Sequence, residues 1–449
     1  MRDAALIVIF TSLIPFVLVR PWTGALVWAW IGFMNPHRLA WGYVQHLPVA
    51  LVFGSLTLFA MWFHRDRKSV PVTRETVVIV LMMILFTITT YYAWMQSAAW
   101  QEWQKVMKIL GFALVTAMLI YGRRRIVALI AVIAGSIAFY GVKGAAFVVD
   151  TAGQYRVKGP EHSFIGANTS LGLAMLMVVP LLAALAQEVE RKWVRMAIYG
   201  VLGLTVVSTV FTYSRGALLG LAAVIPLMLI KANKKFLLFL FMIPVAYKAP
   251  DFIPQKLINR AETIENYQQD YSAMQRIQAW GVSWNVALQN PLTGAGFELE
   301  RLPTPRWLQY AEFQGKNYDS ARAAHSNYFQ VLGEHGFIGL VLYLLLLYFT
   351  FDSLRKVKKQ APGVGLSWMG KYADALQVGL VAYAVSGAFL SLAYFDLYYS
   401  FVILAVIMRR EVAEATENAA FRAPEAREAV PRVPAGRPAK VPTPSLQGR

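Results

Sequence analysis

Residues 126–149 read IVALIAVIAGSIAFYGVKGAAFVV, and this run decides the class of fold. Lys143 is its one charged residue. As a helix it is long enough to cross the roughly 30 Å hydrocarbon core of a bilayer. It does not alternate between apolar and polar residues, as a lipid-facing barrel strand must. The run therefore predicts a membrane-spanning α-helix.

Three further runs, at 76–94, 171–185 and 337–351, have the same apolar character. Of the 449 residues, 57% are hydrophobic and 15% are charged, and the mean hydropathy is +0.46. This composition exceeds what the surface of a soluble globular protein carries. We therefore predict an all-α polytopic membrane protein that contacts membrane lipids.

The basic residues gather in short clusters between the apolar runs, as the positive-inside rule predicts for cytoplasmic loops. We therefore attribute the net charge of +18 to membrane orientation and expect no nucleic-acid partner. The clusters are Arg65/Arg67/Lys68, Arg123/Arg124/Arg125, Arg191/Lys192/Arg195, Lys231/Lys234/Lys235, Arg355/Lys356/Lys358/Lys359 and Arg409/Arg410.

Placing these clusters in the cytoplasm predicts about 12 crossings with both termini cytoplasmic. Arg20-Pro21 splits the first 35 residues into two apolar pieces, which form either one broken span or a hairpin; the count takes them as one span. The other predicted spans lie near 47–63, 76–96, 106–122, 126–149, 166–187, 197–213, 217–231, 236–249, 326–352, 372–391 and 394–408.

This topology divides the chain into four parts. Residues 1–249 hold the N-terminal transmembrane helices with a short periplasmic loop at 151–165, and residues 326–408 hold the C-terminal ones. Residues 250–325 form a polar, mostly helical periplasmic segment. The Ala/Glu/Arg/Pro mixture of residues 409–449 predicts a disordered cytoplasmic tail.

His325 is the candidate general base. It lies just before a predicted transmembrane helix at the periplasmic face, where the positive helix end disfavours protonation of an imidazole. A neutral imidazole can accept a proton. The alternative is a helix-capping residue at the interface. We interpret His335, ten residues later, as structural, and expect Gly333, Gly336 and Gly339 to allow the close approach of a neighbouring helix.

Several basic residues on the periplasmic side are candidates for binding an anion. Arg215 lies in the tight turn Tyr213-Ser214-Arg215-Gly216, where the positive-inside rule disfavours a basic residue. The other candidates are Arg276, which precedes Trp280 by four residues, Arg156 with Lys158, and Lys143. Each alternatively contacts solvent or a lipid headgroup.

A neutral histidine with several arginines suits the transfer of a sugar from a polyprenyl diphosphate. The diphosphate is already a good leaving group that needs cationic stabilisation, so only the acceptor hydroxyl must be activated. The chain has no cysteine, Gly-rich phosphate loop, dinucleotide-binding fingerprint or paired-Asp motif. We therefore expect no metal and no cofactor.

The motifs resemble those of the O-antigen ligase and O-antigen polymerase superfamily of Gram-negative inner membranes. His325-Ser326, nine residues, then Gly336-Phe337-Ile338-Gly339 is similar to the ligase signature. Supporting elements are Ser214-Arg215-Gly216, Arg276 through Trp280, Pro291 through Gly296, and Ser163-Phe164-Ile165-Gly166-Ala167-Asn168. The N-terminal third, with Asn35-Pro36-His37-Arg38, is more similar to putative O-glycosylation ligases found beside exosortase genes.

The resemblance implies a GT-C-like glycosyltransferase of the bacterial inner membrane with its active site on the periplasmic face. It would transfer O-antigen from undecaprenyl diphosphate to lipid A-core in lipopolysaccharide biosynthesis, with inversion and without metal. By the same resemblance, His325 would activate the acceptor hydroxyl, and Arg215 and Arg276 would hold the diphosphate, with Arg156, Lys158 and Lys143 as further candidates.

Other functions remain open at this point. An O-antigen polymerase or a protein O-oligosaccharyltransferase would use the same lipid-linked donor and the same residues. A transporter or flippase would use intramembrane basic residues along a substrate path. The long periplasmic segment and the lack of an inverted repeat argue against a transporter.

Overall fold

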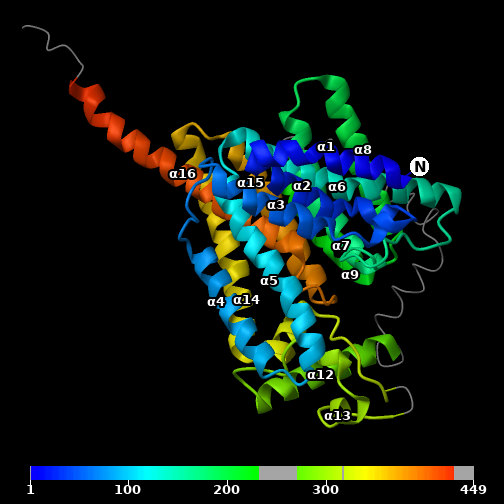
Figure 1. Cartoon of the computed structure of the whole chain (residues 1–449). Coiled ribbons are helices and arrows are strands. Elements are labelled where there is room, and N and C mark those ends of the chain that lie inside the picture. The colour runs from blue at the N-terminus through cyan, green and yellow to red at the C-terminus, as the bar shows by residue number, and fades with distance from the viewer. Residues whose placement is uncertain (1, 232–270, 316–317, 429–449) are drawn as a thin grey trace, which may run out of the picture.

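The computed structural model describes residues 2–231, 271–315 and 318–428 (Figure 1). These residues form helices and connecting loops, with no strand among them, and the predicted all-α class is confirmed. The helices are α1 (Arg2–Val19), α2 (Pro21–Met34), α3 (Val49–Phe63), α4 (Arg74–Tyr91), α5 (Gln96–Leu119), α6 (Gly122–Asp150), α7 (Asn168–Glu188), α8 (Lys192–Val210), α9 (Arg215–Lys231), α12 (Tyr271–Gln289), α13 (Thr304–Leu308), α14 (Asn327–Gln360), α15 (Trp368–Gly387) and α16 (Asp396–Glu428), with short 3-10 helices at Pro36–Leu39, Tyr43–His46, Leu299–Arg301 and Ala361–Val364.

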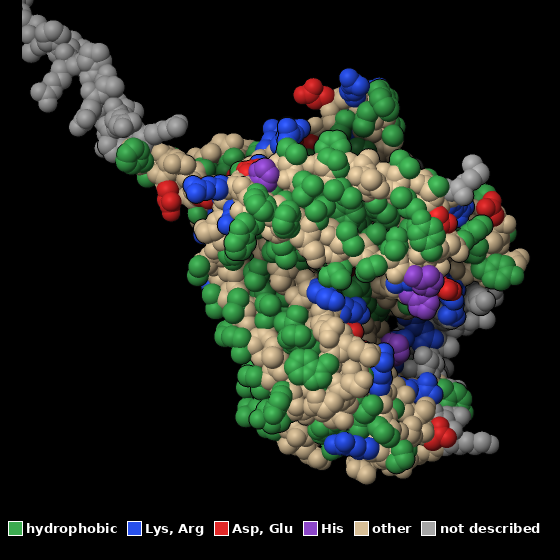
Figure 2. All heavy atoms as spheres, viewed as in Figure 1, with side chains coloured by type: hydrophobic (Ala, Val, Ile, Leu, Met, Phe, Trp, Pro, Cys, Tyr) green, Lys and Arg blue, Asp and Glu red, His purple; other side chains and the backbone are tan. Residues whose placement is uncertain are grey.

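Six of the described helices are long and apolar enough to cross a membrane, namely α1, α4, α6, α7, α8 and α14. The shorter helices α3 and α9 are also apolar. Figure 2 shows many hydrophobic side chains on the face of the helical bundle that is in view. A multi-pass membrane protein is therefore confirmed, whereas the count of about twelve spans and the GT-C-like arrangement stay predictions. The predicted span at 236–249 lies outside the described residues.

The first two helices form a hairpin. Pro21 occupies the first turn of α2, where its missing N–H costs no hydrogen bond. The rings of Phe10 and Trp30 lie 6.0 Å apart. Since Arg20 lies midway between these two residues, their contact requires α2 to fold back along α1. The sequence left a hairpin and a single broken span open, and the structure has the hairpin.

Helix α7 lies at the centre of the bundle. Of an apolar stretch of 18 residues in α7, 83% are buried inside the protein, whereas the corresponding fraction for α8 is 17%. Helices α6, α8, α9 and α15 all pack against α7. Helix α7 is therefore the element around which these four helices are arranged.

Helix α14 is broken at Gly336, whose φ of 66° and ψ of −167° are not helical. The Phe337 N–H donates to the carbonyl of Pro291 at 2.9 Å instead of continuing the helix. The carbonyls of Gly333 and Glu334, released by the break, accept from segment 291–296, as Ala295 N–H to Gly333 at 2.9 Å and Gly296 N–H to Glu334 at 2.8 Å. The segment therefore replaces the missing turn of the helix.

The break also explains two of the three glycines of the motif. A Cβ on Gly336 would lie 2.4 Å from the Pro291 carbonyl oxygen, and one on Gly333 would lie 2.7 Å from Leu299. Gly339 differs, since its nearest neighbour is His335 of the same helix. The expected close approach is therefore real at Gly333 and Gly336. The chain that approaches these two glycines is mainly the segment that follows α12, and not a membrane-spanning helix as expected.

The predicted periplasmic segment lies at one end of the bundle, where Figure 1 shows α12 and α13. Residues 250–270 lie outside the described part. The remainder is held by its own small core, in which Val282, Val286 and Trp307 are almost completely buried. Helices α12 and α13 and the 3-10 helix Leu299–Arg301 lie in this part, and loops connect them to α14.

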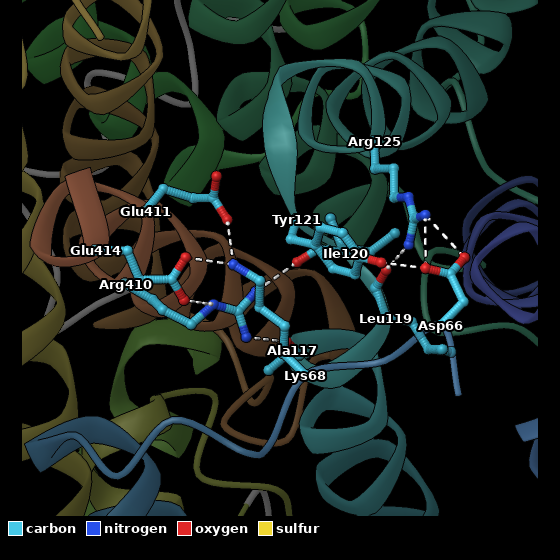
Figure 3. Close-up of polar contacts among 10 residues, drawn as sticks. All are labelled: Asp66, Lys68, Ala117, Leu119, Ile120, Tyr121, Arg125, Arg410, Glu411 and Glu414. Carbon is cyan, nitrogen blue, oxygen red and sulfur yellow. Dashed lines mark hydrogen bonds and ion pairs between the residues drawn. The ribbon is translucent and has the colours of Figure 1, made fainter. Parts of the chain in front are cut away.

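The C-terminal region differs from the disordered tail predicted for residues 409–449, because α16 continues to Glu428. Arg410 donates to the carbonyls of Ala117 at 2.7 Å and Ile120 at 2.8 Å, at the end of α5 (Figure 3). Lys68 pairs with Glu411 at 3.6 Å and with Glu414. These contacts and the high helix propensity of Ala, Glu and Arg extend the helix. Residues 429–449 lie outside the described part.

Candidate functional site

A polar cavity of about 260 Å³ opens beside the start of α14. Helix α12 contributes Gln275 and Arg276, and the chain that leads into α14 contributes Arg322, Ala323 and His325. The structure thus brings the predicted His325 and Arg276 into one cavity. In the same orientation, Figure 2 shows Lys, Arg and His side chains around a hollow between the bundle and the end that carries α12 and α13.

The backbone next to His325 is held in place by Trp280 of α12. The Trp280 Nε1–H donates to the carbonyl of Ala324 at 2.7 Å. The Trp280 ring stacks on Phe329, with centroids 5.2 Å apart and planes 7° apart. His325 itself has a φ of 46°, a conformation that costs free energy in a residue with a side chain and that surrounding contacts must maintain. Trp280 supplies such a contact from α12.

The surroundings of His325 favour its neutral form. Its side chain is exposed, but within a concave cavity where protein replaces part of the hydration shell. This partial burial, and then the charges of Arg276 and Arg322, lower the pKa of His325 below its usual 6.5. A neutral imidazole at pH 7 is able to accept a proton, which is what the sequence predicted. The main cause is burial rather than the helix end.

The first turn of α14 is fixed to the end of α15. Asn327 Oδ1 accepts from the Leu392 N–H at 2.6 Å, and Tyr328 donates to the Ala384 carbonyl at 2.8 Å. A Cβ on Gly387 would lie 2.4 Å from Asn327 Nδ2, so α15 approaches closely only because this residue is glycine. These contacts hold the start of α14, and with it His325, against the bundle.

Arg215 begins α9 after a strained turn. Tyr213 has a φ of 54°, and its hydroxyl donates to the Gly153 carbonyl. The Ala217 N–H donates to Ser214 Oγ at 3.2 Å, which caps α9. Asn168 Nδ2 donates to the Thr212 carbonyl at 2.8 Å, so the predicted loop at 163–168 supports the arginine turn.

Arg215 also lies near the structure that holds His325. A Cβ on its neighbour Gly216 would lie 2.8 Å from Leu390 Cδ1 and 3.6 Å from Phe389 Cβ. The ring of Phe389 lies 6.5 Å from that of Trp280, which bonds the residue before His325. Phe389 and Trp280 therefore connect the two predicted positions, although Arg215 does not line the cavity.

The remaining predicted cations lie outside the cavity. Arg156 and Lys158 are exposed and flank Val157, whose N–H donates to the Phe211 carbonyl at 3.1 Å. This contact brings both residues to the turn that precedes Arg215. Lys143 is exposed on α6.

Sequence reasoning missed Arg322 and Gln275. Arg322 precedes His325 by three residues, and Gln275 is next to Arg276. Proximity along the chain was the available signal. Arg322 also lines a smaller cavity of about 10 Å³ together with Glu300 and Glu334. Burial raises the pKa of Glu300 above its usual value, and the nearby Glu298 adds to the effect.

His335 has the structural surroundings that the sequence interpretation predicted. Its side chain is completely buried, and its ring stacks on Phe86 with centroids 4.1 Å apart. Its Nδ1 is 2.7 Å from Thr89 Oγ1. Within the described ranges, no group of three His, Asp or Glu side chains could hold a metal ion. The expectation of a metal-free reaction stays a prediction.

Comparison with known families gives two matches. Residues 1–190 match a family of unknown function (DUF5935), and residues 200–344 match the family described as O-antigen ligase. No curated protein matches the chain. The ligase match includes Arg215, Arg276, His325 and the glycine break of α14, and it confirms the resemblance that these motifs indicated. The chain is therefore a helical membrane protein that carries a domain of the O-antigen ligase family.

Proposed function

We propose that the protein transfers completed O-antigen polysaccharide from undecaprenyl diphosphate to lipid A-core, at the periplasmic face of the bacterial inner membrane. The observation that carries the proposal is the cavity in which His325 lies beside Arg276 and Arg322. It combines a histidine whose pKa is lowered with two cationic side chains within about 260 Å³. The ligase-family match supports the broad class of reaction.

The proposed reaction is a single displacement. The acceptor hydroxyl attacks the anomeric carbon of the donor sugar, and His325 takes the proton of that hydroxyl. The bond between the anomeric carbon and the diphosphate breaks, and undecaprenyl diphosphate leaves with the electron pair. Arg276 and Arg322 stabilise the charge that grows on the diphosphate. Attack from the side opposite the leaving group inverts the anomeric carbon.

The other predicted cations have supporting roles in this proposal. Arg215 binds the diphosphate from the α9 side, because its turn packs toward Phe389 and Trp280. Arg156 and Lys158 attract the anionic donor toward this turn, since both are exposed beside it. Lys143 contacts a phosphate of the donor or of the surrounding lipid from the exposed side of α6.

The test is a reconstituted transfer reaction. The purified chain is mixed with lipid-linked O-antigen and lipid A-core, with and without chelator, and glycan on the core is followed on a gel. Wild type should transfer in both conditions, and His325→Ala should not. The control is His46→Ala, which removes an exposed histidine outside the cavity.

Other outcomes separate the related functions. A lengthened lipid-linked ladder would indicate a polymerase, and transfer only to an added protein would indicate a protein O-oligosaccharyltransferase. Loss of transfer in chelator that returns with a divalent ion would contradict the metal-free mechanism. A covalent glycosyl adduct trapped on the enzyme would contradict the single displacement.

A further inference from the structure

An open apolar groove of about 1090 Å³ runs between α6, α7 and α8, away from the His325 cavity. Apolar side chains make up nearly all of its wall. The polar exceptions are Arg123 and Arg124 at the start of α6 and Glu188 at the end of α7. The wall of the groove is therefore apolar along most of its length, and its charged side chains lie at one end.

The groove faces the bilayer. Helices α6, α7 and α8 are all candidate membrane spans, so the surface between them meets hydrocarbon. The start of α6, the end of α7 and the start of α8 lie at the same end of the groove. Along α6 the lining extends from Arg123 to Val142, about 28 Å for a helix. This length is close to the hydrocarbon thickness of a membrane, so the arginines lie at the level of lipid headgroups.

The charged end of the groove is cationic. Glu188 pairs with Arg123 at 2.7 Å and with Lys371 at 3.3 Å. Arg124 is exposed and makes no ion pair with the residues that the structure describes. Arg123 and Lys371 thus share one carboxylate, and Arg124 adds a further positive charge at this end of the groove. Trp368, whose ring lies 5.6 Å from the Arg123 guanidinium carbon, adds an aromatic ring of the kind common at membrane interfaces.

We propose that this groove binds one anionic phospholipid, with its phosphate at Arg123 and Arg124 and an acyl chain between α6 and α8. Charge complementarity selects the headgroup, because the end of the groove has excess positive charge. The apolar wall holds the chain by van der Waals packing, which acts between apolar surfaces inside hydrocarbon. This site is distinct from the donor cavity, with which it shares no lining residue.

The groove has room for a chain beside α6. Ala131 and Gly135 are exposed on its wall. A Cβ on Gly135 would meet no atom within 4 Å, so a larger side chain there extends into the groove without a clash. Gly203 on α8 has the same open surroundings but does not line the groove. Substitution of Gly135 should therefore fill part of the groove, and the same substitution at Gly203 is the matched control.

The experiment is native mass spectrometry of the full chain, delipidated in detergent and then titrated with phosphatidylglycerol or phosphatidylcholine. Wild type should retain one phosphatidylglycerol in preference to phosphatidylcholine. Arg124→Gln should weaken phosphatidylglycerol retention about fivefold, as expected for loss of one basic contact. Gly135→Leu should weaken the retention of both lipids, because it occupies the place of the chain.

Two controls make the result specific. Gly203→Leu adds the same bulk outside the groove, and Arg355→Gln removes an exposed arginine on α14. Both should retain lipid as wild type does. Equal retention of phosphatidylglycerol by all four variants would overturn the proposal. A dimer that Gly135→Leu disrupts, without any change in lipid retention, would assign the groove to a second copy of the chain instead.

Discussion

His325 and His335 stand ten residues apart at the start of α14, yet their surroundings are opposite. His325 is exposed in a polar cavity with two arginines, in a backbone conformation with positive φ. His335 is fully buried between Thr89 and the rings of Phe86 and Phe297. A histidine can therefore serve as a reactive group where it is exposed beside charged side chains, and as a packing residue where it is buried among apolar ones.

The largest effects should come from replacing the two histidines separately. His325→Ala should lower the transfer rate about 10²- to 10⁴-fold, the usual contribution of a general base, with an unchanged melting temperature. His335→Ala should lower the free energy of unfolding by about 3 kcal/mol, because it leaves a cavity among buried rings. Rates per folded molecule, measured beside thermal melts, check both. Equal effects of both variants on the rate would contradict the different roles of the two histidines.

The helix break should be the next most sensitive position. Gly336→Ala should lower the free energy of unfolding by about 1–3 kcal/mol, since the positive φ and the Pro291 carbonyl both oppose a Cβ. Thermal melting in detergent measures the change. Gly370→Ala is the matched control, because a Cβ there meets nothing within 4 Å and α15 should gain slightly. A stable Gly336→Ala protein would show that the break is not required.

A smaller effect should follow from Trp280→Phe. The variant keeps an aromatic ring against Phe329 but removes the hydrogen bond to the Ala324 carbonyl, a contact of about 1 kcal/mol. We expect about a fivefold decrease in kcat from misplacement of His325, with little change in KM. Trp284→Phe serves as control, because that partly exposed ring packs on Phe337 outside the cavity. An unchanged kcat would exclude a positioning role for Trp280.

The smallest expected change is a shift in the pH profile of Arg322→Gln, which is separate from the decrease in rate caused by losing a cation at the diphosphate. The charge of Arg322 helps to lower the pKa of His325, so Arg322→Gln should raise that pKa. Because the neutral imidazole is the reactive form, the transfer rate decreases as pH falls through this pKa. The acid limb should therefore move to higher pH in the variant. Arg306→Gln, at Trp94, should leave it in place. A limb that moves to lower pH contradicts the assignment.

The helices and the candidate histidine could be predicted from sequence because their signals are local. Apolar runs and basic clusters gave helices near their observed bounds, and the spacing from His325 to Gly336 indicated the family. The N-terminal hairpin was not decided, because hydropathy does not show which way a chain turns at Arg20. The break at Gly336 was missed for a similar reason. Its hydrogen bonds come from residues 291–296, some forty positions earlier, and no local pattern contains both partners.

The docking of residues 291–296 into the break of α14 has a consequence for biogenesis. The ribosome makes this segment before α14, so the Ala295 and Gly296 N–H groups cannot make these bonds until Gly333 and Glu334 have been synthesised. The part of α14 after Gly336 can enter the membrane as an ordinary span. The carbonyls of Gly333 and Glu334, before the break, gain these partners only when residues 291–296 dock against them. Assembly of the His325 cavity therefore comes late, because it needs both α12 and the first turns of α14 in place.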